Sequence, residues 1–279
     1  MTSSPSPTRT YAEFTARQPA RIRARSVARD LALRGLSLGR RIGGRGWIRF
    51  PYYHHVFDDE RRGFARQLDY LRQFGDFVAI DDAAAMLASD DPVDGRYFCV
   101  GFDDGFKCCA ENALPILAER RIPAIFYVVT ELVGRSFAPD DPTARDTFGF
   151  LGRSTSLDFM DWDDCRALAA AGMTVGSHAA THPYFDRIDR AAAMLELTRS
   201  RETVERETGR PCRHFCAPYG LFDPTRDPAL AGEAGYVSFA TGARGLNRPG
   251  DGAMHLRRDH LLANWGIHQV RYFMSAGDR

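Results

Sequence analysis

The strongest constraint on this chain is the stretch at residues 99–106, where an apolar run ends in two adjacent carboxylates and a glycine. Residues 97–102 predict a buried strand, because they are mostly apolar or aromatic and Gly105 then interrupts the pattern. Two acidic side chains at the end of a buried strand are costly to desolvate unless each has a partner. We therefore expect Asp103 and Asp104 to form part of a site in which one carboxylate binds a metal ion and the other accepts a proton.

The composition is that of an ordinary globular protein. The chain has 279 residues, of which 44% are hydrophobic and 26% are charged, so it is long enough for one large α/β domain. Its six cysteines form no C-x-x-C pair, and no apolar run is long enough to cross a bilayer or to serve as a signal peptide. These features predict a reduced, cytoplasmic setting.

The charge is divided unevenly along the chain. Residues 1–49 contain eleven arginines against Glu13 and Asp30, whereas the formal net charge of the whole chain is only +1. We therefore predict that residues 1–46 form a basic, partly disordered N-terminal arm, and that the folded body spans residues 47–279.

The arm has a helical pattern in which Val27, Leu31, Leu38 and Ile42 share one face, surrounded by arginines. The simplest interpretation is an arm packed loosely on the body. Two alternatives remain open: contact with an anionic membrane surface through residues 9–49, and contact with nucleic acid, which is the less favoured.

Strand and helix patterns alternate throughout the body. This alternation predicts parallel strands joined by crossover helices, in a barrel-like α/β fold whose chemistry lies at the carboxyl ends of the strands. Residues 134–158 show no clear periodicity and predict a long loop over a binding face. The expected strands are residues 47–53, 77–80, 97–102, 124–129, 173–177, 213–216, 236–240 and 255–260.

A second informative stretch, residues 177–183, contains His178 and His182 four positions apart. This spacing lets both imidazoles reach one metal ion, and an added aspartate such as Asp104 gives a two-histidine, one-carboxylate site. Such a site suits either zinc-type hydrolysis or an Fe(II) oxygenase. The adjacent Asp103 favours hydrolysis, because that reaction needs a nearby general base.

Three motifs together resemble the polysaccharide deacetylase (NodB-homology) family, the carbohydrate esterases of family four. They are Gly-Phe-Asp-Asp-Gly at 101–105, Ser-His-x-x-Thr-His-Pro at 177–183 and Ala-Pro-Tyr-Gly at 217–220, and the resemblance extends over residues 48–275. It implies a distorted (β/α) barrel of about seven parallel strands, with residues 47–279 as the catalytic domain. It also implies a metal-dependent hydrolase that removes an N-acetyl group from an amino sugar in a polysaccharide or glycan precursor.

The resemblance also implies roles for individual residues. Asp103 would be the base that activates the attacking water. The backbone amide of Tyr219 would help to hold the oxyanion, with Pro218 and Tyr219 contacting the substrate. The divalent metal, usually zinc in this family, would be held by Asp104, His178 and His182.

Two departures from the family pattern leave roles to be filled. Cys216 stands where the family often has an arginine that orients the catalytic aspartate, and we expect Arg258 to take over that role. Cys216 itself is more plausible as inert packing than as a nucleophile. A late Leu-x-His motif, which usually supplies the general acid in this family, is not clearly present, since His255 and His260 lie near the expected region but in a different context. We predict His54 as the acid, the alternative being a buried histidine with a structural hydrogen bond.

The remaining aromatic and histidine residues are less informative. Phe148 and Phe150, inside the predicted loop, are candidates for substrate contact. Trp162 could stack on a sugar ring or pack in the core. His55 should point away from the site, and His214 and His268 should be structural or exposed.

Three other functions compete with the leading one: a deacylase or amidohydrolase acting on a non-sugar amide, a non-catalytic glycan-binding module, and an arginine-rich nucleic-acid binder. A non-catalytic module would be expected to lack the base or a metal ligand, yet all four residues are present. The absence of a signal peptide suggests a substrate in the cytoplasm or at the inner membrane face, such as a lipid-linked or nucleotide-linked amino sugar.

Overall fold

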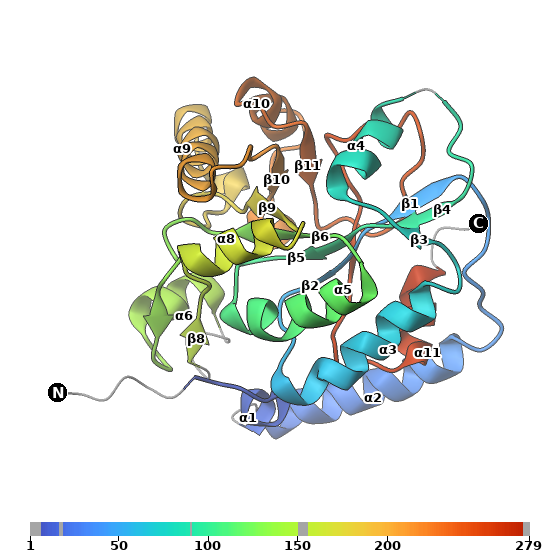
Figure 1. The fold of residues 1–279 in the computed structure, drawn as a ribbon. Coiled ribbons are helices and arrows are strands. Elements are labelled where there is room, and N and C mark those ends of the chain that lie inside the picture. Colours follow the sequence, from blue (N-terminus) through green and yellow to red (C-terminus); the bar gives the residue numbers. More distant parts are fainter. Residues whose placement is uncertain (1–6, 17–18, 90, 150–155, 276–279) are drawn as a thin grey trace.

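The computed structural model describes residues 7–16, 19–89, 91–149 and 156–275. Its centre is a sheet of seven strands in the order β11-β10-β9-β6-β5-β2-β12, and every neighbouring pair in it is parallel (Figure 1). The sheet curls into an open barrel, which confirms the predicted distorted (β/α) barrel of about seven parallel strands. Its strands are β2 (Pro51–Tyr53), β5 (Val100–Phe102), β6 (Ala124–Val128), β9 (Thr174–Ser177), β10 (His214–Cys216), β11 (Ser238–Ala240) and β12 (Asp259–His260).

Helices surround this sheet, as the alternating pattern requires (Figure 1). Helix α8 illustrates how the sequence sets a boundary, since Asp161 and Asp164 cap its first turn reciprocally. The helices are α1 (Tyr11–Ala16), α2 (Ala20–Leu36), α3 (Arg61–Leu71), α4 (Ile80–Ala88), α5 (Leu114–Arg120), α6 (Pro142–Phe148), α8 (Trp162–Ala170), α9 (Arg190–Thr208), α10 (Asp227–Glu233) and α11 (Ile267–Met274).

Two expected strands are each divided between two sheets. Residues 47–53 form β1 (Trp47–Arg49) and β2, and residues 97–102 form β4 (Arg96–Phe98) and β5. Strands β1 and β4 join β3 (Asp76–Phe77) in a separate three-stranded sheet. The amide of Cys99 still donates to the carbonyl of Arg49 at 2.9 Å. The two segments of the chain, residues 47–53 and 96–102, therefore remain paired where both pass from one sheet into the other.

The N-terminal arm is packed more closely than expected. The ring of Phe14 lies 5.4 Å from Phe57 and 5.7 Å from His55, and the carbonyl of Arg9 accepts a hydrogen bond from the amide of Asp58. Helix α2 lies along α11, where Leu33 is buried. Residues 1–6, for which we predicted disorder, lie outside the described residues.

The residues of the predicted apolar face of the arm differ in their exposure. Val27, Leu31 and Leu38 are 60%, 62% and 73% exposed, whereas Ile42 is buried beyond the end of the helix. None of the helices in the described parts of the chain is long and apolar enough to cross a membrane.

The segment at 134–158 is more ordered than a plain loop. Strands β7 (Ser136–Phe137) and β8 (Leu157–Asp158) pair antiparallel, with α6 between them, and residues 150–155 lie outside the described residues. Phe137, Ala144 and Phe159 belong to a small apolar cluster of its own. These elements are too short to produce a readable period, which is why the sequence suggested a loop.

Candidate metal centre and active site

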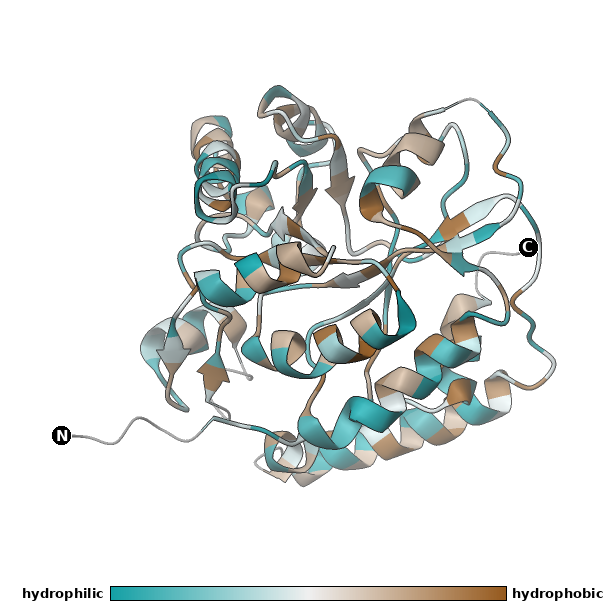
Figure 2. Cartoon of the chain, in the orientation of Figure 1, coloured by the Kyte–Doolittle hydropathy of each residue, from teal (hydrophilic) through white to brown (hydrophobic). Residues whose placement is uncertain are grey.

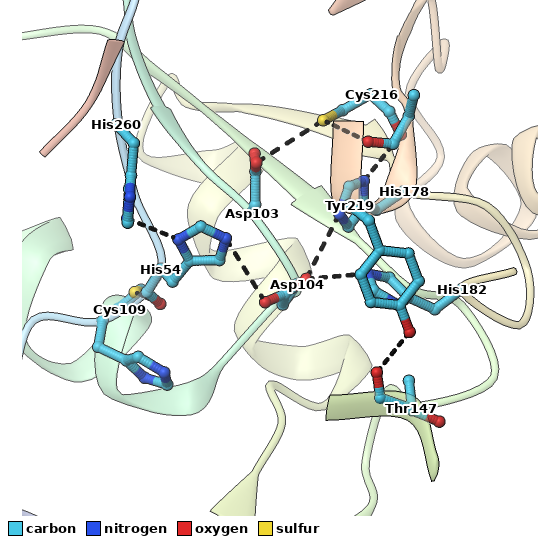
Figure 3. A network of polar contacts seen from close by, with 12 residues as sticks. His54, Asp103, Asp104, Cys109, Thr147, His178, His182, Cys216, Tyr219 and His260 are labelled. Atoms are coloured by element: carbon cyan, nitrogen blue, oxygen red, sulfur yellow. Dashed lines mark hydrogen bonds and ion pairs between the residues drawn. The ribbon is translucent and has the colours of Figure 1, made fainter. Parts of the chain in front are cut away.

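The polar residues singled out in the sequence gather at the carboxyl ends of neighbouring strands (Figure 3). Asp103 and Asp104 follow β5, His178 follows β9, Cys216 ends β10 and His54 follows β2. Parallel strands bring their carboxyl ends to one rim, so residues that are distant in sequence meet there.

Asp104, His178 and His182 form a compact buried cluster. Oδ1 of Asp104 lies 3.4 Å from Nε2 of His178 and 3.2 Å from Nε2 of His182. Ligand atoms of the three side chains all lie within 4.8 Å of one another. Two imidazoles and one carboxylate are a usual donor set for zinc and related divalent metals.

The hydrogen bonds of the two histidines fit a metal ion. Nδ1 of His178 donates to the carbonyl oxygen of Cys216 at 2.7 Å, which leaves the lone pair of Nε2 directed toward Asp104. Nε2 of His182 faces Asp104 at 3.2 Å without the geometry of a hydrogen bond, and its Nδ1 has no hydrogen-bond partner among the described residues, although both nitrogens are buried. Unpartnered buried nitrogens are costly, and a coordinated metal would satisfy one of them.

Unusual backbone conformations concentrate at this rim. Asp104, Ala179, His182 and Tyr219 have φ values of 69°, 67°, 64° and 57°, a region that non-glycine residues seldom adopt. Gly105, at φ 80°, also lies so near to β6 that an added Cβ would come within 3.2 Å of a valine methyl. Strained backbone of this kind is typical of functional sites.

Arg258 forms a bidentate ion pair with Asp103. Its Nη1 and Nη2 each lie 2.8 Å from one carboxylate oxygen, and both side chains are about 4% exposed. The guanidinium is fixed in turn by the carbonyl of Thr241, at 2.9 Å from Nε, and by the ring of Tyr52, 4.0 Å away. Burial, the largest single influence, would raise the pKa of Asp103, but the charge and hydrogen bonds of Arg258 together with the nearby His178 and His54 outweigh it and lower that pKa below its usual value.

Cys216 lies beside this pair rather than in place of the arginine. Its Sγ is 3.0 Å from Nη2 of Arg258 and 3.7 Å from Oδ2 of Asp103. Burial raises the pKa of the Cys216 thiol, so the thiol is neutral near pH 7 and a poor nucleophile. The small side chain leaves room for the guanidinium of Arg258, which immediately precedes β12, to reach Asp103.

His54 has a partner that sequence reasoning missed. Its Nδ1 lies 3.0 Å from Nε2 of His260, and its Nε2 lies 3.9 Å from Oδ2 of Asp104. His54 is one-third exposed, and burial lowers its pKa. His260 pairs with Tyr52 in the register of β12 on β2, a neighbourhood that only the strand order reveals.

A cavity of about 410 Å³ opens over these groups. Phe148 and Tyr219 line it, and the ring of Phe148 lies 5.3 Å from His182. Tyr219 stacks on Tyr184 at 4.0 Å, and its hydroxyl donates to the carbonyl of Thr147. Neither Tyr184 nor Thr147 was expected from the sequence.

Two of the residues considered for substrate contact are not among those that line this cavity. The partly buried ring of Trp162 packs against the main core, and Pro218 is buried; neither lines the cavity. A single aromatic residue at a helix start does not reveal which side of the barrel it faces. Phe150 lies outside the described residues. His55 points away from the site, with its ring 4.2 Å from that of Phe106.

His214 and His268 have the structural roles that we expected. His214 is buried, with Nδ1 2.8 Å from the hydroxyl of Ser238. Nδ1 of His268 lies 3.3 Å from the hydroxyl of Ser37.

Comparison with known proteins decides the family. The sequence model of a family described as polysaccharide deacetylase matches residues 90–238, more than half of the chain. The chain belongs to the polysaccharide deacetylase family. The match includes Asp103, Asp104, His178, His182 and Cys216, and it confirms the resemblance drawn from the three motifs.

Solved structures of similar proteins agree with this assignment. IcaB from Ammonifex degensii is 28% identical, with a TM-score of 0.69 over 84% of this chain and 98% of that one. The Streptococcus pyogenes deacetylase PplD, solved with acetate, is 17% identical, with a TM-score of 0.67 over 83% of this chain and 99% of that one. The BpsB deacetylase domain from Bordetella bronchiseptica is 19% identical, with a TM-score of 0.61 over 77% and 96%. The last two show a shared fold.

Proposed function

We propose that this polysaccharide deacetylase is a metal-dependent hydrolase that removes an N-acetyl group from an amino sugar of a glycan or glycan precursor. A divalent metal, for which we propose zinc, held by Asp104, His178 and His182 would lower the pKa of the attacking water and polarise the acetyl carbonyl. The observation that carries the proposal is a second carboxylate, that of Asp103, beside this cluster and held in place by Arg258.

Asp103 is the proposed general base. Arg258 engages both oxygens, so the carboxylate is ionised and its orientation is fixed before the substrate arrives. A water in the cavity would transfer a proton to this carboxylate as the water oxygen attacks the acetyl carbon. Arg258 contacts the base rather than the substrate, so we assign it a positioning role.

His54 and Tyr219 are proposed to act on the tetrahedral intermediate. The backbone amide of Tyr219 would donate a hydrogen bond to the oxyanion. His54 would protonate the leaving amine, with its Nδ1 held by His260 so that Nε2 faces the cavity. The ring of Phe148, at the cavity wall, is the proposed stacking surface for the sugar.

Acetate release tests the reaction and its substrate class. We expect the purified, metal-loaded protein to release acetate from N-acetylglucosamine oligomers, and Asp103→Asn to lose at least about a hundredfold in turnover while it keeps its fold. Acetate release from N-acetylated peptides but from no amino sugar would instead support the deacylase alternative. Full activity in Asp103→Asn would overturn the assigned base.

A further inference from the structure

Helix α2 presents its apolar side chains to solvent rather than to the body of the protein. Val27 and Leu31 are 60% and 62% exposed, and Leu38 just beyond the helix is 73% exposed. Of the large hydrophobic residues exposed in the described parts of the chain, half lie between residues 22 and 38. Figure 2 shows hydrophobic segments alternating with hydrophilic ones along α2.

The inward face of α2 is the more polar of its two faces. Residues that are at least partly covered recur as Ser26, Asp30, Leu33 and Ser37, a spacing that marks one side of a helix. Leu33 is the one large apolar residue in this set. A helix that served only to cover the body would have the reverse arrangement, because apolar burial is what stabilises such packing.

The outward face is a narrow stripe, which we define as Ala24, Val27, Leu31 and Leu38. Its three helical members recur at intervals of three and four residues, so they align on one side of α2. At about 100° per residue, Arg23 and Arg34 lie along one edge of the stripe, Arg21 lies beyond the other edge, and Arg25 lies further round the helix on that side. These four arginines are exposed and form no ion pair with any described residue.

We propose that this stripe docks on the surface of an anionic lipid bilayer. An apolar strip with cationic residues along both edges suits the interface, where apolar side chains enter the acyl boundary and arginines meet phosphate groups. A second copy of the chain fits less well, because facing stripes would bring arginines against arginines. Nucleic acid fits less well too, because the outermost side chains are apolar rather than cationic.

The inner side of the same helix reaches the catalytic region. Ile22, Ser26 and Arg29 line a cavity of about 310 Å³ that is also lined by His54 and His260. A protein docked through the stripe would therefore hold the rim of the barrel near the membrane. The docking itself does not depend on the proposed reaction and can be tested without a substrate.

Vesicle sedimentation with the full chain tests the proposal. We expect binding to vesicles that contain phosphatidylglycerol, much weaker binding to pure phosphatidylcholine, and loss of binding as salt rises. Val27→Gln with Leu31→Gln should weaken binding at least about tenfold. Removing the charges of Arg21, Arg25 and Arg34 should weaken it on the order of a hundredfold.

The matched control is Leu195→Gln on α9, where an equally exposed leucine (62%) lies far from the stripe in sequence. This variant should bind like the wild type, and all variants should melt at the wild-type temperature because the substituted side chains are exposed. Three results would overturn the proposal: no lipid preference in the wild type, unchanged binding after the Val27 and Leu31 substitutions, or a dimer in solution that those substitutions dissociate.

Discussion

The replacement Arg258→Lys tests how much the geometry of the Arg258–Asp103 ion pair contributes, because it keeps the positive charge but removes the planar guanidinium that contacts both carboxylate oxygens. In the structure the guanidinium makes two hydrogen bonds of 2.8 Å to Asp103 and one of 2.9 Å to the carbonyl of Thr241. A lysine ammonium can replace one contact to the carboxylate, but not the planar pairing of both oxygens. Losing a charge-assisted hydrogen bond and the bond to Thr241 should cost about 3 kcal/mol of unfolding free energy.

The effect on catalysis should be a loss of turnover. With one oxygen released, Asp103 can rotate, and a displacement of about 1 Å at a catalytic group can cost about a hundredfold in rate. We therefore expect Arg258→Lys to lower kcat about a hundredfold, with KM and metal content close to those of the wild type. The assay is acetate release under saturating substrate, with elemental analysis of the same sample.

The adjacent Arg257 supplies the control. Its side chain is 45% exposed and pairs with Asp251 at 3.3 Å on the surface, so Arg257→Lys should change the unfolding free energy by less than about 1 kcal/mol and leave kcat unchanged. Full activity in Arg258→Lys, or an equal loss in Arg257→Lys, would refute the positioning role.

Three further predictions use other parts of the molecule. His54→Gln should lower kcat by about 10²–10⁴-fold with metal retained, whereas His55→Gln, facing away, should not; equal effects would remove His54 as the acid. Burial raises the pKa of Glu60 to about 7 in the folded state. Between pH 4.5 and 7 the Glu60 carboxyl therefore binds a proton more in the folded state than in the unfolded state, so the wild-type protein loses stability as the pH rises through that window. Glu60→Gln should therefore gain up to about 3 kcal/mol relative to the wild type by pH 8 in denaturant titrations, and a constant difference would contradict this. Finally, Cys216→Arg should restore part of the turnover lost in Arg258→Ala, and no recovery in a folded double variant would show that the two positions are not interchangeable.

The proximity of Asp104, His178 and His182 was predictable because the sequence signals for it are local. The pair Asp103–Asp104 and the pair His178–His182 each mark a strand end, and parallel strands bring their ends to one rim. His260 could not be found in the same way, because its contact with His54 spans 206 residues and depends on β12 lying next to β2. No local sequence pattern indicates that β12 and β2 are neighbours.

Amphipathic patterns were informative about faces but not about which way a face points. The arm contained a correct apolar stripe through Val27 and Leu31, yet the structure directs it outward. Trp162 shows the same ambiguity for a single aromatic residue, which the fold places against the core. Both outcomes depend on tertiary packing, and residue spacing does not determine them.

The most direct test of the whole account is the metal content of the purified protein. We expect about one divalent metal ion per chain in the wild type, with the content lost in Asp104→Asn and His178→Ala. The neighbouring Asp103→Asn is the matched control, and it should keep the metal while it loses turnover. A correctly folded wild-type protein that binds no metal and still releases acetate would contradict the assignment of Asp104, His178 and His182.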